Sequence, residues 1–183
     1  MRKKRSEKYF IFFLGISLLV GVVVIDSFTQ KRSKQKRGGE VMEIQSTAFK
    51  HNEFIPEKYS CKGADINPDL EWKNVPEGTQ SFALSVKDPD APTGTFVHWL
   101  VYDISKDKRE IAENSVPGKQ VKNNFRKEDY GGPCPPSGVH RYFFRLYALD
   151  VETLGKIDSM EAFDEKVKEH TIDHAELMGK FEK

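Results

Sequence analysis

The sequence predicts a mainly β protein: a two-sheet antiparallel β-sandwich with two short C-terminal helices, preceded by an N-terminal transmembrane helix. Three observations favour this fold class. Segments rich in β-branched and aromatic residues are separated by clusters of Pro, Gly and Asp, which is typical of strands joined by turns. Helical periodicity appears only near the C-terminus, whereas a parallel α/β fold needs helices between its strands. The length of 183 residues suits one domain with an appendage.

The appendage begins with a basic stretch, residues 1–8, followed by an uncharged and mostly apolar run from Tyr9 to Ile25. A helix that crosses a bilayer needs about 20 residues, with a lower limit of about 17. A basic start also suits a cleaved signal peptide, but no A-x-A-like site follows the run. We therefore expect an uncleaved signal anchor over residues 9–28 and a basic linker over residues 29–40.

The charges around the apolar run do not set its orientation, because five Lys or Arg side chains precede it and five follow it. The first helix of an exported protein usually keeps its basic end in the cytoplasm. We therefore expect a single-pass membrane protein whose domain, residues 41–183, is extracytoplasmic.

The net charge of +1 hides an uneven distribution. Residues 1–40 carry ten of the 29 Lys and Arg side chains and three of the 28 Asp and Glu side chains. Residues 41–183 therefore carry 19 basic and 25 acidic side chains, a net charge of −6. This acidic balance argues against nucleic acid as a partner.

The elements of the domain follow from hydrophobic periodicity. Strands are expected over residues 41–49, 81–88, 96–104 and 141–150. In the second of these, Phe82, Leu84 and Val86 alternate with small or polar residues, which is the pattern of a strand with one buried face. Two helices are expected near the C-terminus, over residues 159–170 and 174–181, because apolar side chains recur there at helical spacing and a helix-start signal separates the two segments.

Three loops at strand ends carry the residues that suit a binding site, because the loops of a sandwich gather at its ends. They are YSCKGADINP (59–68), KDPDAPTG with the following VHW (87–94 and 97–99), and YGGPCPPSGVHRY (130–142). His98 and His140 can each donate an N–H to an anion, and Asp88 can orient one imidazole by accepting its other N–H. Prolines hold such loops in place before a ligand binds.

These residues also have ordinary structural explanations. A histidine on an apolar strand is often a satisfied core residue. Asp88 and Asp90 can cap the turn through their side chains, and Tyr142 can be part of ordinary sheet packing. Residue types alone leave these alternatives open.

The motifs DPDAP, HW and GPCPP-x-G-x-HRY, in this order, resemble those of the phosphatidylethanolamine-binding protein family, in particular its bacterial and archaeal branch described as Raf-kinase-inhibitor-like. The similarity extends from about Ser46 to HAELMGKF at the C-terminus. One departure is NNFRKEDYGGP, where the family pattern reads N-D-F/Y-G before the glycine-rich turn.

The resemblance implies a two-sheet sandwich with a small pocket for phosphate and phosphorylated head groups. It also implies a cis peptide bond between Ala91 and Pro92. Asp65, in the first of the three loops, is a further candidate for the rim of the pocket. The ligand-binding residues that it implies in this sequence are Asp88, His98, Gly132, Pro133, His140 and Tyr142, with Gly132 and Pro133 lining the entrance through their backbone.

The two cysteines, Cys61 and Cys134, lie one in each of two loops that flank the expected pocket. An extracytoplasmic domain would allow them to pair. Both cysteines belong to the family motif, however, so their presence does not report the compartment, and the pairing stays open. A catalytic thiol is not favoured, because Cys134 lies between prolines with no evident base beside it.

The leading functional prediction is a membrane-tethered binding protein with no enzymatic activity, no cofactor and no metal. Its predicted partners are a phosphate-bearing small molecule or lipid head group and a kinase or protease that it regulates. The alternative is a phosphoester hydrolase or metal site that uses His98, His140 and Asp88, although no G-x-S-x-G or P-loop motif is present. A third interpretation is a surface adaptor whose pocket is vestigial.

Overall fold

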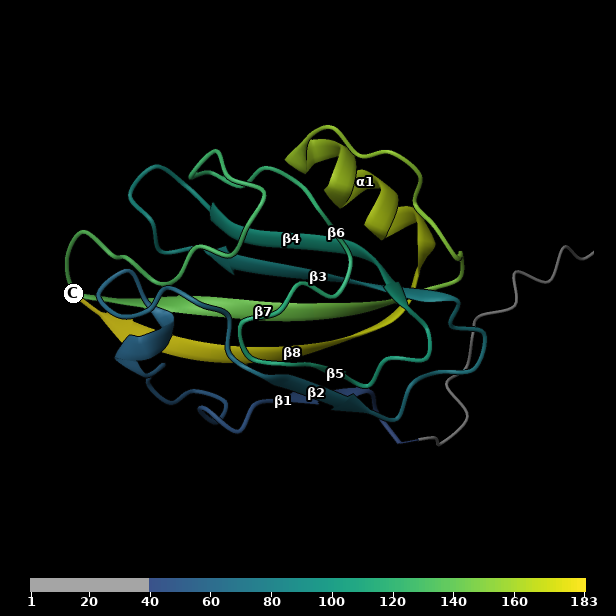
Figure 1. Ribbon diagram of the computed structural model, residues 1–183, viewed down its shortest axis with the longest axis horizontal. Coiled ribbons are helices and arrows are strands. Elements are labelled where there is room, and N and C mark those ends of the chain that lie inside the picture. The colour runs from purple at the N-terminus through teal and green to yellow at the C-terminus, as the bar shows by residue number, and fades with distance from the viewer. Residues whose placement is uncertain (1–39) are drawn as a thin grey trace, which may run out of the picture. The chain divides into compact units, whose positions relative to one another are not determined.

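Two antiparallel sheets and one α-helix make up residues 40–183, the part of the chain that the computed structural model describes (Figure 1). One sheet has three strands in the order β1-β2-β5, and the other has five in the order β6-β4-β3-β7-β8. The elements are β1 (Glu43–Gln45), a 3-10 helix (Glu57–Tyr59), β2 (Leu70–Lys73), β3 (Ser81–Asp88), β4 (Phe96–Ser105), β5 (Glu110–Ile111), β6 (Lys119–Gln120), β7 (Val139–Leu149), α1 (Met160–His170) and β8 (Thr171–Glu182).

The first apolar core fills the space between the two sheets. Trp99, Tyr142 and Phe144 of the five-stranded sheet are among its largest side chains, and all three are buried. The three-stranded sheet contributes Trp72, whose ring meets Phe82 edge-on at a centroid distance of 5.3 Å. Burial of such aromatic side chains from both sheets stabilises their face-to-face packing.

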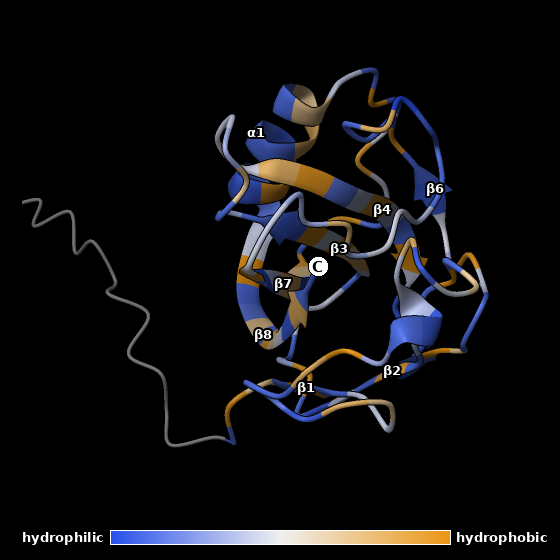
Figure 2. Cartoon of the chain, turned by 90° about the vertical axis from the view of Figure 1, so that its left-hand side faces the viewer, coloured by the Kyte–Doolittle hydropathy of each residue, from blue (hydrophilic) through white to orange (hydrophobic). Residues whose placement is uncertain are grey.

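The second apolar core lies on the opposite face of the five-stranded sheet, which α1 covers (Figure 2). Phe163 and Val167 are four residues apart on α1, so both point toward the sheet, where Ala83 and Leu100 belong to the same cluster. Ser159 caps the start of the helix, because its hydroxyl accepts a hydrogen bond of 3.1 Å from the backbone N–H of Ala162.

Because α1 covers one face and the three-stranded sheet covers the other, β3 is buried on both sides. The alternation predicted for this strand is therefore not an alternation between core and solvent. Ser81, Ala83 and Ser85 are as buried as the larger side chains between them, and they face the helix layer. Small side chains suit this face because a helix has to approach the strand closely.

The prediction of two C-terminal helices is wrong, because residues 171–182 form the strand β8 and not a second helix. β8 pairs with β7 along its whole length, from Leu149 opposite Thr171 to Val139 opposite Glu182. Its alternate residues, Ala175, Leu177 and Phe181, are buried, so the periodicity is that of a strand. The helix ends at His170 and the strand begins at the next residue.

No helix within residues 40–183 is long and apolar enough to cross a membrane. The predicted basic N-terminus (1–8) and signal anchor (9–28), with all but the last residue of the linker (29–40), lie outside the described residues. The transmembrane helix, and the localisation as a single-pass membrane protein with an extracytoplasmic domain, gain no support from the structure. The predictions of a transmembrane helix and of a single-pass membrane protein are therefore not retained.

Removing the Phe163 ring should destabilise the fold through the second core. Phe163 is completely buried between α1 and the sheet, so Phe163→Ala leaves a cavity and should lower the free energy of unfolding by about 3–5 kcal/mol. Glu165→Ala, on the exposed side of the same helix, should change it by less than about 0.5 kcal/mol. Denaturant titration of both variants measures the difference, and a similar loss in both would contradict the packing role of Phe163.

Candidate functional site

A cavity of about 280 Å³ lies where the end of β3 meets the start of β4 and the loop before β7. It is lined by Asp88, Ala91, Pro92, Thr93, Phe96, His98, Phe125, Cys134 and Pro136. Two connections that are distant in the sequence, β3 to β4 and β6 to β7, therefore meet at the point where the polar residues Asp88 and His98 lie on neighbouring strands.

The Asp88 carboxylate links the cavity to His140. One carboxylate oxygen, Oδ2, accepts a hydrogen bond of 2.7 Å from Nδ1–H of His140, and the other, Oδ1, accepts one of 2.8 Å from the backbone N–H of Asp90. Both side chains of the Asp88–His140 pair are buried. Asp88 therefore has both roles that the sequence suggested, because it caps the turn and orients a histidine.

His98 is held by the backbone of the loop before β7. Its Nδ1 lies 2.8 Å from the carbonyl oxygen of Gly131, so Nδ1 carries the proton and donates. Burial lowers the pKa of His98 below its usual value, although the Gly131 carbonyl and the Asp88 carboxylate partly oppose this effect. A neutral imidazole in this tautomer has a lone pair at Nε2, which has no hydrogen-bond partner within residues 40–183.

Tyr142 packs against the other side of His98. The two rings meet edge-on at a centroid distance of 5.1 Å, and the tyrosine is fully buried. Burial is the main cause that raises the pKa of Tyr142, and the Asp88 carboxylate adds to it. The phenol is therefore protonated, yet its hydroxyl makes no well-aligned hydrogen bond within the described residues. A buried hydroxyl without a partner calls for an explanation such as an ordered water, and the Cys134 backbone and the Asp88 carboxylate are its polar neighbours here.

Gly132 and Pro133 do not line the cavity. The N–H of Gly132 donates to a carboxylate oxygen of Asp65 at 2.7 Å, and the Pro133 carbonyl accepts from the N–H of Cys61 at 3.2 Å. These contacts fasten the loop before β7 to residues 59–65, so Asp65 supports the loop and does not form the rim. A Cβ on Gly132 would lie 2.2 Å from the carbonyl oxygen of Tyr59, so the loop can approach this closely only with glycine.

Two further expectations concern the loops. No peptide bond within residues 40–183 is cis, so the bond predicted to be cis between Ala91 and Pro92 is trans. The turn is held instead by the contact between Asp88 and the Asp90 backbone. The cysteine pairing that the sequence left open is present, because Cys61 and Cys134 form a disulfide.

Asp90 has a different role from that of Asp88. Its carboxylate accepts two hydrogen bonds from the Arg141 guanidinium, at 2.6 and 2.8 Å, and one from the Arg141 backbone. The side-chain hydrogen bonds to Arg141 are the largest cause that lowers the pKa of Asp90 to about 2. This pair joins the DPDAP loop to the start of β7 beside the site.

Phe96 and Phe125 are site residues that the sequence reasoning missed. The Phe125 ring lies 4.8 Å from that of Phe96 and 5.4 Å from that of His98, measured between centroids. It rests on Gly131, where an added Cβ would lie 2.5 Å from the ring. The NNFR stretch stood out because it departs from the family pattern. Nothing in its residue types, however, indicated that the Phe125 ring reaches the pocket.

The turn that carries Phe125 is fastened to β4 on both sides of His98. Asn123 donates from its side chain to the His98 carbonyl at 2.8 Å. Asn124 donates its N–H to the Val97 carbonyl at 3.0 Å, and its side-chain oxygen accepts from the Val97 N–H at 2.6 Å. The turn closes with Arg126 in the left-handed region, at a φ of 65°, where the family pattern has glycine.

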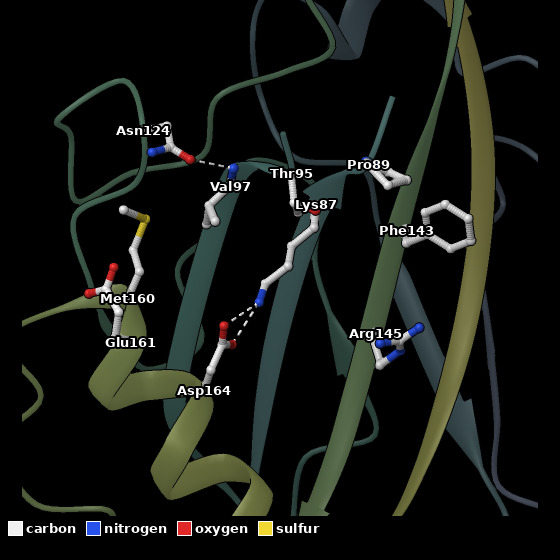
Figure 3. A pocket seen from close by; sticks show the side chains of 10 residues that line it. All are labelled: Lys87, Pro89, Thr95, Val97, Asn124, Phe143, Arg145, Met160, Glu161 and Asp164. Atoms are coloured by element: carbon white, nitrogen blue, oxygen red, sulfur yellow. Dashed lines mark hydrogen bonds and ion pairs between the residues drawn. The ribbon is translucent and has the colours of Figure 1, made fainter. Parts of the chain in front are cut away.

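A larger groove of about 630 Å³ lies on the opposite face of the same strand ends, between α1 and the sheet (Figure 3). Its cations are already paired, because Lys87 donates to both oxygens of Asp164, at 2.6 and 2.8 Å, and Arg145 pairs with Glu176. The smaller cavity is instead lined by His98, whose Nε2 has no hydrogen-bond partner among the described residues. We therefore assign the candidate site to the smaller cavity.

The structure gives the metal alternative little geometric basis. Asp88 and His140 contact each other directly, and no group of three His, Cys, Asp or Glu side chains in the described part of the chain is arranged to hold a metal ion. His170 and His174 are four residues apart, a spacing that would place two ligands on one face of a helix, but His170 ends α1 and His174 lies in β8.

Comparisons with known proteins agree with this architecture. A family model described as phosphatidylethanolamine-binding protein matches residues 45–182. A UPF0098 protein of Aquifex aeolicus is 53% identical over 126 residues, which cover 64% of this chain and 74% of the relative. A UPF0098 protein of Pyrococcus abyssi is 38% identical over 157 residues, which cover 80% of this chain and 88% of the relative.

Two solved structures are also similar. One is described as a putative phosphatidylethanolamine-binding protein homologue, CT736 of Chlamydia trachomatis; it has a TM-score of 0.74 and 39% identity and covers 78% of this chain and 98% of its own. The other is YbcL of E. coli, described as a new member of the mammalian PEBP family. It has a TM-score of 0.74 and 29% sequence identity, and the match covers 79% of this chain and 99% of the YbcL chain.

Replacing Arg126 with glycine should stabilise the protein. A non-glycine residue in the left-handed region is strained by roughly 1–2 kcal/mol, and the added flexibility of the unfolded chain offsets part of this relief. Arg126→Gly should therefore raise the free energy of unfolding by up to about 1 kcal/mol. Lys127→Gly is the matched control; its backbone is not in that region, so the added flexibility of the unfolded chain should lower stability by up to about 1 kcal/mol. Denaturant titration of both variants measures the two changes in the free energy of unfolding. A loss in Arg126→Gly as large as that in Lys127→Gly would contradict the strain at this turn.

Proposed function

The chain belongs to the phosphatidylethanolamine-binding protein family, and we propose that it is a binding protein whose pocket beside Asp88, His98 and His140 takes a phosphate-like anion. The anion is carried by a small molecule or by a lipid head group. We propose no enzymatic role for the pocket. A regulatory action on a kinase or a protease stays a prediction.

The observation that carries the proposal is the set of oriented polar atoms with spare hydrogen-bonding capacity. Nδ1 of each imidazole is bound to an acceptor, the Asp88 carboxylate or the Gly131 carbonyl, which fixes the rings and leaves Nε2 of each without a partner among the described residues. The Tyr142 hydroxyl also lacks a partner, but Tyr142 and His140 lie behind the lining residues and are not part of the cavity surface. A site that is ordered before binding loses less conformational entropy when the ligand enters.

The charge of the anion has to be met by a proton, because no Lys or Arg lines the cavity. His98 is neutral in the free protein and has a lone pair at Nε2. An anion would therefore favour its protonated form, in which both ring nitrogens donate. A ligand that brings its own P–OH group would instead donate to Nε2 without protonating the ring.

The hydrolase alternative has weaker support. Cys134 is bonded to Cys61 and is not a free thiol. Both oxygens of Asp88 already accept hydrogen bonds, one from His140 and one from the turn backbone, so this carboxylate is committed to holding its neighbours. These contacts favour orientation of a ligand over transfer of a phosphoryl group.

Asp88→Asn should weaken sulfate binding more than Asp90→Asn does. The Asp88 change removes the charge-assisted hydrogen bond that orients His140, which corresponds to about 1.5–3 kcal/mol, or about a 10- to 100-fold loss of affinity. The Asp90 change weakens a partly exposed pair with Arg141 and should cost less than about 1 kcal/mol in affinity. Calorimetric titration of sulfate measures both. Equal losses would assign Asp88 to the turn alone.

The affinity for sulfate should fall as pH rises. A bound anion raises the pKa of His98 relative to the free protein, so binding takes up a proton. Affinity is then highest below the free pKa, falls about tenfold per pH unit between the free and bound pKa values, and levels off above them. Because burial lowers the free pKa, the fall begins below about pH 6.5, the value of a model histidine.

The measurement is calorimetric titration of sulfate into the full-length chain between about pH 5 and 8, where sulfate itself does not titrate. His98→Ala and His140→Ala should lose binding, and His174→Ala, an exposed histidine on β8, serves as the matched control. A flat profile in the unsubstituted protein, or unchanged affinity in both site variants, would overturn the two-histidine pocket.

A further inference from the structure

The Cys61–Cys134 disulfide is part of the pocket wall. Cys134 lines the cavity together with Asp88 and His98, whereas Cys61 follows the 3-10 helix on the far side of the loop. Both cysteines are exposed. A reductant can therefore reach the bond without unfolding the protein.

Residues 130–133 are fastened on two sides by hydrogen bonds. Toward β4, Gly131 donates its N–H to the His98 carbonyl at 3.2 Å and accepts from the His98 imidazole at 2.8 Å. Toward residues 59–65, the Tyr130 hydroxyl donates to the Tyr59 carbonyl at 3.0 Å, and Gly132 donates to Asp65. These residues do not line the cavity themselves, and their hydrogen bonds hold the start of the loop without the disulfide.

The stretch that follows Cys134 is held by the disulfide. Residues 135–137 make no hydrogen bond in the described structure, and the next attachment after Cys134 is the Gly138 carbonyl, which accepts from the N–H of Lys183 at 3.2 Å. Pro136, within this stretch, lines the cavity. The Pro133 carbonyl accepts from the N–H of Cys61 at 3.2 Å, and the covalent bond at Cys134 is the last attachment before this stretch, so the disulfide restrains the wall that Cys134 and Pro136 form.

We propose that the Cys61–Cys134 disulfide controls the affinity of the pocket, with the oxidised protein binding the anion tightly and the reduced protein binding it weakly. This inference rests on the proposed function, because it concerns the same site. A dithiol supplies two electrons and two protons, the S–S bond breaks into two thiols, and the dithiol becomes a disulfide. The freed wall then has to be ordered again by each ligand that binds.

The test is calorimetric titration of sulfate into the full-length oxidised chain and into the same protein reduced with dithiothreitol, with thiol counting to confirm zero and two free thiols. Reduction should weaken binding about tenfold. The variant with both Cys61→Ala and Cys134→Ala should match the reduced protein and show no response to dithiothreitol. Far-UV circular dichroism of each sample follows the fold.

The outcomes distinguish redox control of the pocket from anion binding itself. Equal affinity in the oxidised and reduced proteins overturns redox control but leaves the anion pocket standing. Absence of sulfate binding in both forms overturns the proposed function, and redox control falls with it. Loss of binding together with loss of the folded spectrum shows that the disulfide only holds the fold together, which also overturns redox control.

Discussion

Coverage of both faces of β3 and β4 is the constraint on which the rest of the described structure depends. With α1 on one side and the three-stranded sheet on the other, these strands have almost no solvent-facing side chains. Polar groups on them are therefore paired with neighbours, because burying an unpaired polar group is costly. The hydroxyl of Ser81 donates to the Val151 carbonyl, and His98 donates to Gly131. The same requirement ties Asp88 to His140, so the geometry of the site follows from the burial of the strands that carry it.

Much of the site could be predicted from the sequence, because its polar residues stand out against apolar strands. Asp88, His98 and His140 follow that rule, and the structure brings them together. The residues that were missed or misplaced are apolar or act through their backbone. Phe125 belongs to an ordinary-looking turn, and its position depends on hydrogen bonds from Asn123 and Asn124 to another strand. Gly132 was placed at the entrance, but its contact with Asp65 crosses 67 residues of sequence.

The errors in the fold have a similar cause. Residues 174–181 have apolar side chains that fit helical spacing as well as alternation, and short segments of this kind are ambiguous in isolation. The outcome was decided by β7, which offers a ladder of eleven residues to a neighbouring strand. Likewise, Ser81, Ala83 and Ser85 indicated a solvent-facing side of β3, and only the position of α1, about 75 residues further along the chain, makes that face a second core.

The direct passage from α1 into β8 also determines where the chain tolerates changes of length. No residue separates His170 from Thr171, so an insertion or deletion at this point cannot be absorbed by a loop. It would either unwind the last helical turn, or shift β8 by one position and turn Leu177 and Phe181 from the core to the surface. Evolutionary variation in length, and any engineered fusion, should therefore be tolerated better at exposed turns away from the site, such as the turn at Gly78, where an added side chain meets no neighbouring atom.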